Sequence, residues 1–185
     1  MGKLVVLYGP SASGKTSIAT SLGIEKVATA TSRKKRDGEV DGVDYYFKTE
    51  KQFEKMIDKG ELAEHSKYVG NYYGCPKSSL EEVFSGNDSK VVVLDIEGVK
   101  YLKENHADKD IKYLYIGCYL DSIERRLSQR NLSEEELTDR LTRAEIKELS
   151  HKYRQHADEI IWNNDGMDVE NVINHIKKLL KFWNY

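Results

Sequence analysis

Residues 9–16 carry the feature that most restricts what this chain can fold into. They read Gly-Pro-Ser-Ala-Ser-Gly-Lys-Thr, which matches the pattern G-x-x-x-x-G-K-T. Residues 4–8 in front of them are apolar and mostly β-branched or aromatic, which suits a strand buried on both faces. Residues 17–22 behind them have the composition of a short helix. This order of strand, loop and helix favours a phosphate-binding loop over a glycine-containing turn that binds nothing.

The residue types of this loop suit a polyphosphate ligand. Gly9 and Gly14 allow the backbone to turn its N–H groups inward, and the start of the helix adds positive partial charge. Lys15 supplies a point charge that can reach the β- and γ-phosphates. The Thr16 hydroxyl is a hard oxygen ligand that suits Mg²⁺. The loop therefore predicts a nucleotide site that works with Mg²⁺.

The composition excludes several classes of protein. A chain of 185 residues, 39% hydrophobic and 32% charged, can bury one core, and global disorder is not expected. A net charge of −2 gives no bulk attraction to nucleic acid or to a membrane surface. Cys75 and Cys118 form neither a disulfide framework nor a zinc spacing, which favours free thiols in a reducing cytosol. Because we find no leader and no apolar run as long as a membrane span, we expect a soluble cytoplasmic protein.

Hydrophobic patterns and turn signals predict strands that alternate with helices. Two helices begin at capping boxes, residues 49–52 and 133–136, and an amphipathic helix closes the chain from Asp168. Another helix is expected over residues 98–105. The expected strands are residues 4–8, 26–29, 43–47, 62–69, 72–75, 91–95, 113–118 and 160–162. This alternation favours an α/β fold, with a parallel sheet covered by helices on both faces.

Two segments interrupt this alternation. Residues 30–86 are expected to form a small α+β lobe, and the arginine-rich residues 121–150 a further insertion. Both follow core strands, and ligands of such folds bind at the carboxyl ends of strands, so both should overhang the phosphate loop. The core domain would comprise residues 1–29, 87–120 and 151–185.

One acidic residue has two possible roles at this stage. Asp95 ends an apolar strand, as the second acidic element of phosphate-loop proteins does near the metal. The pattern is common, so whether Asp95 reaches the Mg²⁺ shell or serves elsewhere stays open.

Four further motifs follow the loop along the chain. The first is the basic run of residues 33–39, followed by Gly42 and residues 44–47, and the second is Glu64 with the segment Gly70-Asn71-Tyr72-Tyr73-Gly74. The third comprises Arg130, Arg140, Ala144 and Glu148, and the fourth is residues 161–163. Together with the loop, these motifs resemble the guanylate kinase family over nearly the whole chain. In order, they are similar to the family's signature for the GMP phosphate, its guanine-binding region, its lid pattern and its adenine segment.

The resemblance implies a fold and an activity. It implies a P-loop NTPase-type parallel sheet with helices on both faces, a GMP-binding lobe at residues 30–86 and a helical lid at residues 121–150. Such an enzyme is a kinase that transfers the γ-phosphoryl group of ATP to GMP or dGMP, giving ADP and GDP in purine nucleotide metabolism. Mg²⁺ would accompany ATP. The implied partners are small nucleotides, with no nucleic acid, no membrane and no obligate protein partner.

The resemblance also implies roles for individual residues. ATP would be bound by Gly9, Pro10, Ser11, Ala12, Ser13, Gly14, Lys15, Thr16 and Asn163, with Thr16 holding the metal. GMP would be bound by Thr29, Arg33, Arg36, Glu39, Tyr45, Glu64, Tyr73, Cys75, Asp95 and Glu97. The catalytic residues would be Lys15, Arg33, Arg130 and Arg140. Independently of any family, a phosphomonoester dianion needs forked cations and hydroxyl donors, and one carboxylate can accept both hydrogens on the guanine edge.

Three positions depart from the family pattern. Lys35 stands where the family commonly has Pro, and Cys75 stands where it has Ser or Thr. The family's D-I-D-x-Q-G segment is two residues shorter here, so Glu97 either replaces its second Asp or aligns with its Gln. Two of these changes fall on base recognition, which leaves a broader (deoxy)nucleoside monophosphate kinase as an alternative. A non-catalytic module that binds phosphorylated peptides is a second alternative, although such modules usually lose the ATP loop that is intact here.

Overall fold

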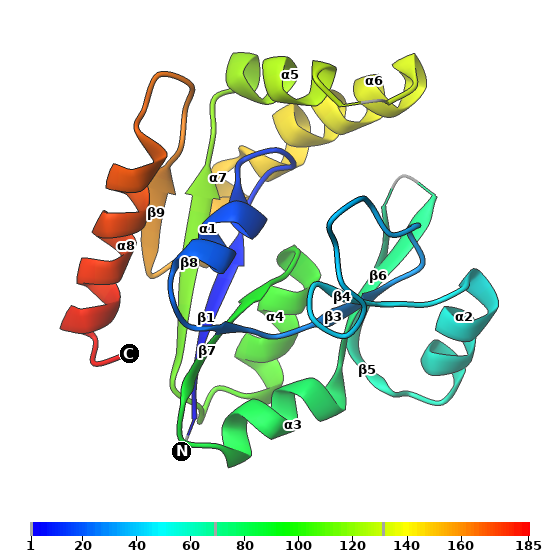
Figure 1. The fold of residues 1–185 in the computed structure, drawn as a ribbon, viewed down its shortest axis with the longest axis vertical. Helices are drawn as coiled ribbons and strands as arrows, with labels where there is room; N and C mark the ends of the chain where they lie inside the picture. The colour runs from blue at the N-terminus through cyan, green and yellow to red at the C-terminus, as the bar shows by residue number, and fades with distance from the viewer. Residues whose placement is uncertain (1, 69, 131) are drawn as a thin grey trace. The chain divides into compact units, whose positions relative to one another are not determined.

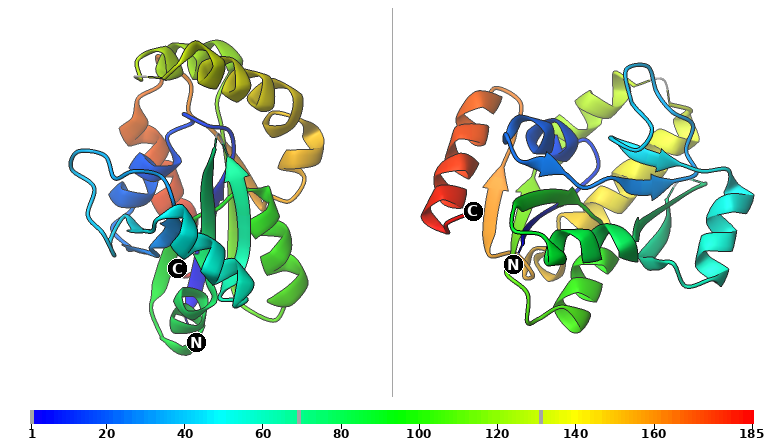
Figure 2. Two further views of the ribbon diagram at one scale, coloured as in Figure 1. Left: turned by 90° about the vertical axis from the view of Figure 1, so that its right-hand side faces the viewer. Right: turned by 60° about the horizontal axis from the view of Figure 1, so that its bottom comes forward.

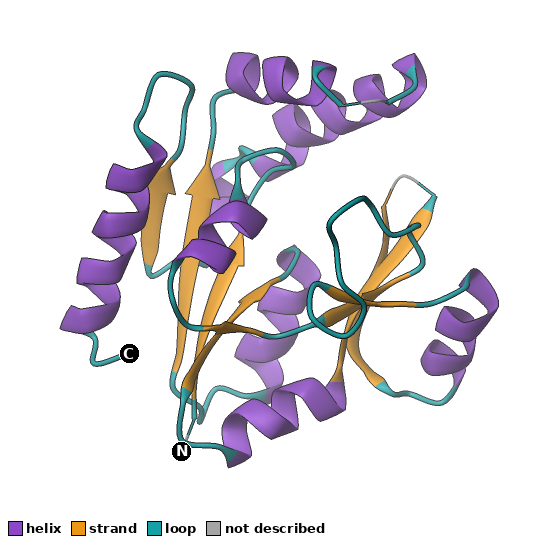
Figure 3. Ribbon diagram, in the orientation of Figure 1, coloured by secondary structure: helices purple, strands orange, loops and turns teal. Residues whose placement is uncertain are grey.

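The computed structural model describes residues 2–68, 70–130 and 132–185 (Figures 1 and 3). Its strands fall into two sheets, with the orders β2-β7-β1-β8-β9 and β4-β3-β6-β5. The strands are β1 (Lys3–Tyr8), β2 (Glu25–Lys26), β3 (Thr29–Thr31), β4 (Tyr45–Phe47), β5 (Leu62–Tyr68), β6 (Asn71–Pro76), β7 (Ser89–Val93), β8 (Ile111–Gly117) and β9 (Glu159–Trp162). The helices are α1 (Lys15–Ser21), α2 (Glu50–Asp58), α3 (Lys77–Ser85), α4 (Ile96–Asn105), α5 (Leu120–Ser128), α6 (Glu134–Arg143), the π-helix η1 (Ala144–Glu148), α7 (His151–Arg154) and α8 (Val169–Phe182).

The chain divides into two compact units. Unit 1 comprises Met1–Val6 and Ile24–Ile111, and unit 2 comprises Leu7–Gly23 and Lys112–Tyr185. The predicted lobe, residues 30–86, falls within unit 1, and the predicted lid, residues 121–150, falls within unit 2.

Unit 1 contains the four-stranded sheet and the parallel pair β2–β7. In the four-stranded sheet, β3 lies between β4, with which it pairs in parallel, and β6, with which it pairs antiparallel. Helix α2 begins at the predicted capping box, in which Thr49 accepts a hydrogen bond from the Gln52 backbone. It contributes Phe53 to a core cluster that also contains Ala30 and Leu62.

Unit 2 contains the parallel pair β8–β9, and the phosphate loop joins the end of β1 to α1. Figure 1 and the right-hand view of Figure 2 agree that α8 lies along β9. Helix α8 buries Val172, Ile176 and Leu180, three positions of its predicted apolar face. A second core cluster, built on Cys118, Ile123, Leu127 and Ala144, joins the start of α5 to the π-helix.

The expected α/β class with a parallel sheet is confirmed, whereas some predicted elements are wrong in detail. The single strand predicted for residues 26–29 is two strands in different sheets. Val27 donates its backbone N–H to the carbonyl oxygen of Val91 in β7, and two residues later Thr29 pairs with Tyr45 in the other sheet. The predicted strand at residues 62–69 is present as β5, and its last residue, Val69, lies outside the described residues. Helix α3, which buries Leu80 and Val83, was not among the predicted elements.

No helix in the part of the chain that the structure describes is both long and apolar enough to cross a membrane. The longest helix, α8, carries Lys177, Lys178 and Lys181 among its apolar residues.

Candidate active site

The loop at residues 9–16 folds around the ammonium group of Lys15. Lys15 Nζ donates hydrogen bonds to the carbonyl oxygens of Gly9, at 2.9 Å, and Pro10, at 2.6 Å. Burial lowers the pKa of Lys15 to about 8, although the charge of Glu148 acts in the opposite direction. The positive charge of Arg130 lowers the same pKa further, so that arginine lies within electrostatic range of the loop. A cation is therefore held, partly buried, against carbonyl oxygens of the loop, where electrostatic interactions are stronger than in water.

Both glycines of the loop pattern are required by its shape. Gly9 has a φ of 139°, and a methyl group there would lie 2.3 Å from the carbonyl oxygen of Ile116. Gly14 has a φ of 92°, and a methyl group there would lie 2.5 Å from Asn163 Nδ2. Either contact is closer than carbon atoms tolerate, so substitution would displace the loop backbone.

Asn163 was expected beside adenine, and the structure places its amide against the loop. Nδ2 of Asn163 donates to the carbonyl oxygen of Ser13 at 2.9 Å, and the Asn163 residue is 5% exposed. Its position follows from β9, whose last residue pairs with Gly117 of β8.

Each unit contains a cavity lined by candidate site residues. The cavity of unit 1 has a volume of about 510 Å³ and is lined by Glu64 and Glu97, among others. The cavity of unit 2 has a volume of about 600 Å³. The cavity of unit 2 lies beside the loop and is lined by Ala12, Gly14, Arg126, Arg130, Asn163 and Asp165, among others. Asp165 fixes the position of Arg126, which also lines this cavity, because the Asp165 carboxylate accepts from Arg126 Nε at 2.7 Å. The same carboxylate pairs with Arg125 Nη1 at 3.1 Å. A volume of this size suits a small organic ligand.

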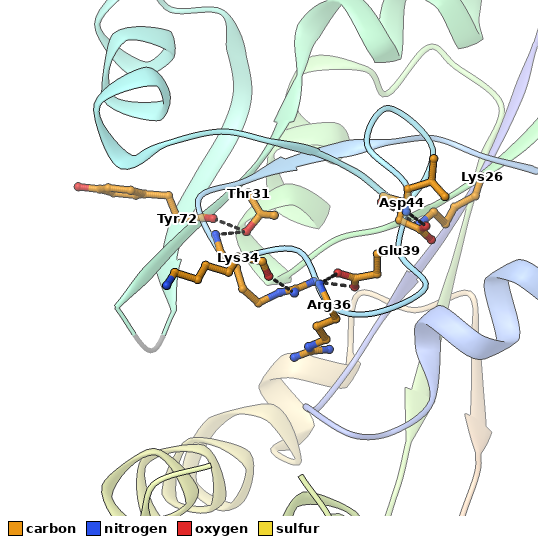
Figure 4. Close-up of polar contacts among 9 residues, drawn as sticks. Lys26, Thr31, Lys34, Arg36, Glu39, Asp44 and Tyr72 are labelled. Atoms are coloured by element: carbon orange, nitrogen blue, oxygen red, sulfur yellow. Dashed lines mark hydrogen bonds and ion pairs between the residues drawn. The ribbon is translucent and has the colours of Figure 1, made fainter. Parts of the chain in front are cut away.

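In unit 1, the basic segment after β3 is organised by Glu39. Its carboxylate accepts from Arg33 Nη2 at 2.7 Å and from the backbone N–H of Arg36 at 2.8 Å. Figure 4 shows the Glu39 carboxylate meeting the backbone near Arg36, whose own side chain points away from it. Partial burial alone would raise the pKa of Glu39, but the hydrogen bonds and charges of the arginines hold that pKa below its usual range. The segment is therefore pre-formed, with the Arg36 side chain exposed.

Strand pairing brings the hydroxyl-bearing residues to the same place. Thr29 lies opposite Tyr45 in the register of β3 and β4, and Thr31 lies opposite Tyr73 in the register of β3 and β6. Burial raises the pKa of Tyr45, and the neighbouring Tyr73 raises it further. The guanidinium carbon of Arg33 lies 5.5 Å from the centre of the Tyr45 ring. These side chains form one cluster of hydrogen-bond donors.

A second, acidic cluster lies at β5, β6 and the start of α4. Glu64 pairs with Cys75 across the strands, and burial raises its pKa well above the usual value, with the charges of Asp95 and Glu97 adding to the effect. Asp95 is the N-cap of α4, where its Oδ1 accepts from the backbone N–H groups of Glu97 and Gly98. Glu97 Oε1 accepts from Lys100 Nζ at 2.9 Å. A guanine edge with two donors would relieve the repulsion among these carboxylates.

The thiol of Cys75 is buried beside the acidic cluster, on strand β6 opposite Glu64. The residue is fully buried, and its Sγ lies 3.8 Å from the carbonyl oxygen of Pro76, to which it donates. Burial raises the pKa of this thiol, as does the charge of Glu64. Cys75 is therefore a neutral group next to the acidic cluster.

Two residues that hold the loop were not singled out for that role from the sequence. Arg126 Nη1 donates to the carbonyl oxygen of Ala12 at 3.2 Å, and Glu148 Oε2 accepts from the backbone N–H of Ser11 at 3.1 Å. Both lie in the charged segment after residue 120. The position of Glu148 in the lid pattern was the available signal, but a pattern does not say which atoms meet.

Comparisons with known proteins agree with one another. The family model described as guanylate kinase matches residues 1–182. The chain is 33% identical to a guanylate kinase of Fusobacterium nucleatum, covering 89% of this chain and 90% of that protein. It is 32% identical to one of Mycoplasmoides gallisepticum, covering 99% and 94%. A crystal structure of guanylate kinase from Anaplasma phagocytophilum is similar with a TM-score of 0.76 and 29% identity, covering 97% of this chain and 85% of that one. A shikimate kinase of Bacteroides thetaiotaomicron, at 16% identity and a TM-score of 0.53, shares the fold.

Proposed function

This chain belongs to the guanylate kinase family, and we propose that the two groups of side chains described above divide the work of an ATP:GMP phosphotransferase. The phosphate loop of unit 2 binds ATP, and the donor and acidic clusters of unit 1 bind GMP. The observation that supports this most strongly is the partly buried Lys15 ammonium, which carbonyl oxygens hold inside an intact phosphate loop. A non-catalytic binding module has no need of such a group.

For ATP, the loop from Gly9 to Thr16 supplies N–H groups and Lys15 supplies charge. Lys15 Nζ leaves the carbonyl oxygens of Gly9 and Pro10 for the β- and γ-phosphates, where it stabilises the charge that develops in transfer. Arg130 and Arg140 assist at the transferred group, and Asn163 supports the loop. Adenine occupies the 600 Å³ cavity beside Arg126.

We also propose that Mg²⁺ binds together with ATP, with Thr16 as a ligand. Among the described residues no three His, Cys, Asp or Glu side chains gather into a metal cluster. The exposed Thr16 hydroxyl, on the first turn of α1, is a suitable oxygen donor. Mg²⁺ commonly keeps several waters and binds through few protein groups plus substrate phosphates, so this donor set fits it. When bound with ATP, the ion would neutralise phosphate charge.

For GMP, the donor cluster takes the phosphate and the acidic cluster takes the base. The GMP phosphate is surrounded by Arg33, Arg36, Tyr45 and Tyr73. These side chains are supported by Thr29 and Glu39. Glu64 accepts the two hydrogens on the guanine edge, with Cys75, Asp95 and Glu97 around it. Because Asp95 Oδ1 already caps α4, we propose that Asp95 orients Glu97 and the helix start instead of entering the Mg²⁺ shell.

The remaining parts of the proposal concern organisation and location. We propose that residues 30–86 act as the GMP-binding lobe, residues 121–150 as the lid, and the rest as the core. Both cysteines are free and buried, which suits a reducing compartment, so we place the enzyme in the cytoplasm, working on nucleotides without an obligate protein partner.

The test is a coupled ADP-release assay with GMP, dGMP, AMP, CMP, UMP and dTMP as acceptors. We expect turnover with GMP and dGMP, and little with the others. Comparable turnover with AMP or a pyrimidine nucleotide would favour the broader monophosphate kinase. No ADP release with any acceptor would contradict the catalytic proposal.

A prediction for the phosphate cluster follows. Arg33→Ala and Arg36→Ala should each raise the KM for GMP about 10- to 150-fold, because each loses a charged hydrogen bond that contributes about 1.5–3 kcal/mol. The KM for ATP should change little. Lys35→Ala, which alters an exposed cation in the same segment, is the matched control. A larger effect on ATP than on GMP would mean that the two nucleotide sites are assigned the wrong way round.

A further inference from the structure

The π-helix η1 places Glu148 between two partners. The backbone N–H of Leu149 donates to the carbonyl oxygen of Ala144, which widens the turn at the end of α6. π-Turns are rare, and they often occur at functional sites. In this turn Glu148 points inward, its side chain 6% exposed, while Glu145 on the same turn is exposed.

The carboxylate of Glu148 is held firmly. Oε1 accepts from Arg143 Nε at 2.9 Å, and Oε2 accepts from the backbone N–H of Ser11 at 3.1 Å. The main-chain oxygen of Glu148 accepts from the Tyr115 hydroxyl at 2.7 Å. A buried carboxylate is costly unless it is paired and hydrogen-bonded, and here both conditions are met. Glu148 therefore links the end of α6 to the phosphate loop.

The loop contains a strained residue at this point. Ala12 has a φ of 60°, which is unfavourable for a residue with a β-carbon. Strain of this kind persists only where the surroundings enforce it. The Glu148 carboxylate accepts from the backbone N–H of Ser11, the residue before Ala12. The Arg126 guanidinium donates to the carbonyl oxygen of Ala12. The Asn163 amide donates to the carbonyl oxygen of Ser13, the residue after Ala12. Three successive residues are thus fixed by side chains from η1, from α5 and from the position just after β9.

We propose that Glu148 is a positioning residue for the phosphate loop, which it holds in the strained shape that presents its N–H groups to the phosphates of ATP. Through Arg143 the same carboxylate ties the loop to α6, the helix that carries Arg140. This inference rests on the proposed function, since it assumes that the loop binds ATP.

An opposite role for Glu148 would give an opposite experimental result. A carboxylate on a loop N–H could act as a stand-in for a phosphate group, which ATP then has to displace. In that case removing its charge would tighten ATP binding. The firm anchoring of Glu148 by Arg143 and Tyr115 favours a fixed support over a displaceable one.

The experiment compares Glu148→Gln and Glu148→Ala with the control Glu145→Ala, which removes an exposed carboxylate from the same turn. Initial rates are measured while ATP and GMP are varied separately. We expect Glu148→Ala to raise the KM for ATP about tenfold, as expected for a small misplacement of binding groups, and Glu148→Gln to raise it less. The KM for GMP should stay within about twofold of wild type.

A second measurement needs no catalysis. Amide hydrogen exchange of the nucleotide-free proteins should show faster exchange at Ser11 in both Glu148 variants, with amides of β1 and β8 unchanged. The proposal would be overturned if the Glu148 variants had the same KM for ATP as Glu145→Ala, or if they bound ATP more tightly than wild type. Unchanged amide exchange at Ser11 in these variants would also overturn it. If Glu148→Ala does not fold, Glu148→Gln decides alone. A wild-type protein without kinase activity would instead count against the proposed function, and the exchange data would still test the support of the loop.

Discussion

Lys15→Ala should lower kcat for GMP phosphorylation by about a thousandfold or more while the protein remains folded. The Lys15 ammonium is held inside the loop by two of its carbonyl oxygens, and removal of a pre-organised charge from a transition state has effects of this size. The fold should survive, because the substitution also removes the free-energy cost of burying an ammonium group. The measurements are steady-state rates and far-ultraviolet circular dichroism with a thermal melt.

The matched control for this variant is Lys3→Ala. Lys3 is another partly buried lysine, at the start of the strand that leads to the loop, where it pairs with Asp110 at 3.8 Å. Its removal should leave turnover within about twofold of wild type, as surface ion pairs contribute little. Near-normal turnover in Lys15→Ala, with an unchanged spectrum, would refute the transfer role of the loop.

Glu64→Gln should lower kcat/KM for GMP about 100- to 1000-fold. The amide accepts one guanine hydrogen and turns an N–H toward the other, so a charged hydrogen bond is lost and a buried donor is left unmatched, at a cost of about 3–4 kcal/mol. Apparent affinity for ATP should not change. The control is Glu61→Gln, which alters an exposed carboxylate three positions earlier in the chain, immediately before β5. Equal losses for GMP in both variants would mean that Glu64 does not read the base.

The raised pKa of Glu64 adds a pH dependence with a definite sign. Folding raises this pKa well above the usual 4.5, so the folded protein retains a proton that the unfolded chain releases. The free energy of unfolding contributed by this group is therefore fully present below about pH 4.5 and is lost as the pH rises through the folded pKa. Relative to wild type, Glu64→Gln should melt at an increasingly higher temperature as the pH is raised from 5 to 8. Binding of GMP requires the carboxylate, so the wild-type KM for GMP should fall over the same range.

A pH-independent difference in melting temperature between wild type and Glu64→Gln would show that this carboxylate is not perturbed in the free protein. The same melts on Glu61→Gln provide the baseline. Together, the rates and melts separate loss of base recognition from a general change in stability.

Much of the architecture follows from local sequence signals. The capping boxes at Thr49 and Ser133 form as predicted, because each needs only a hydroxyl and an acceptor three residues apart on one chain segment. The buried strand β1 and the loop after it follow from an apolar run and two glycines whose positions leave no room for a side chain. The parallel α/β class follows from the alternation of such segments. These features depend on residues that are close together in the chain, so they can be predicted from the sequence alone.

What the tertiary structure decided is how distant residues meet. The predicted strand at residues 26–29 divides between two sheets, because its pairing partners, Val91 and Tyr45, lie on different segments of the chain. The widened π-turn that turns Glu148 toward Ser11 joins positions 137 residues apart, and no local pattern encodes that contact. The same holds for Asn163, which is 150 residues from Ser13. The sequence alone determined that a phosphate loop exists, and three contacts from remote elements decided the shape in which its backbone is held.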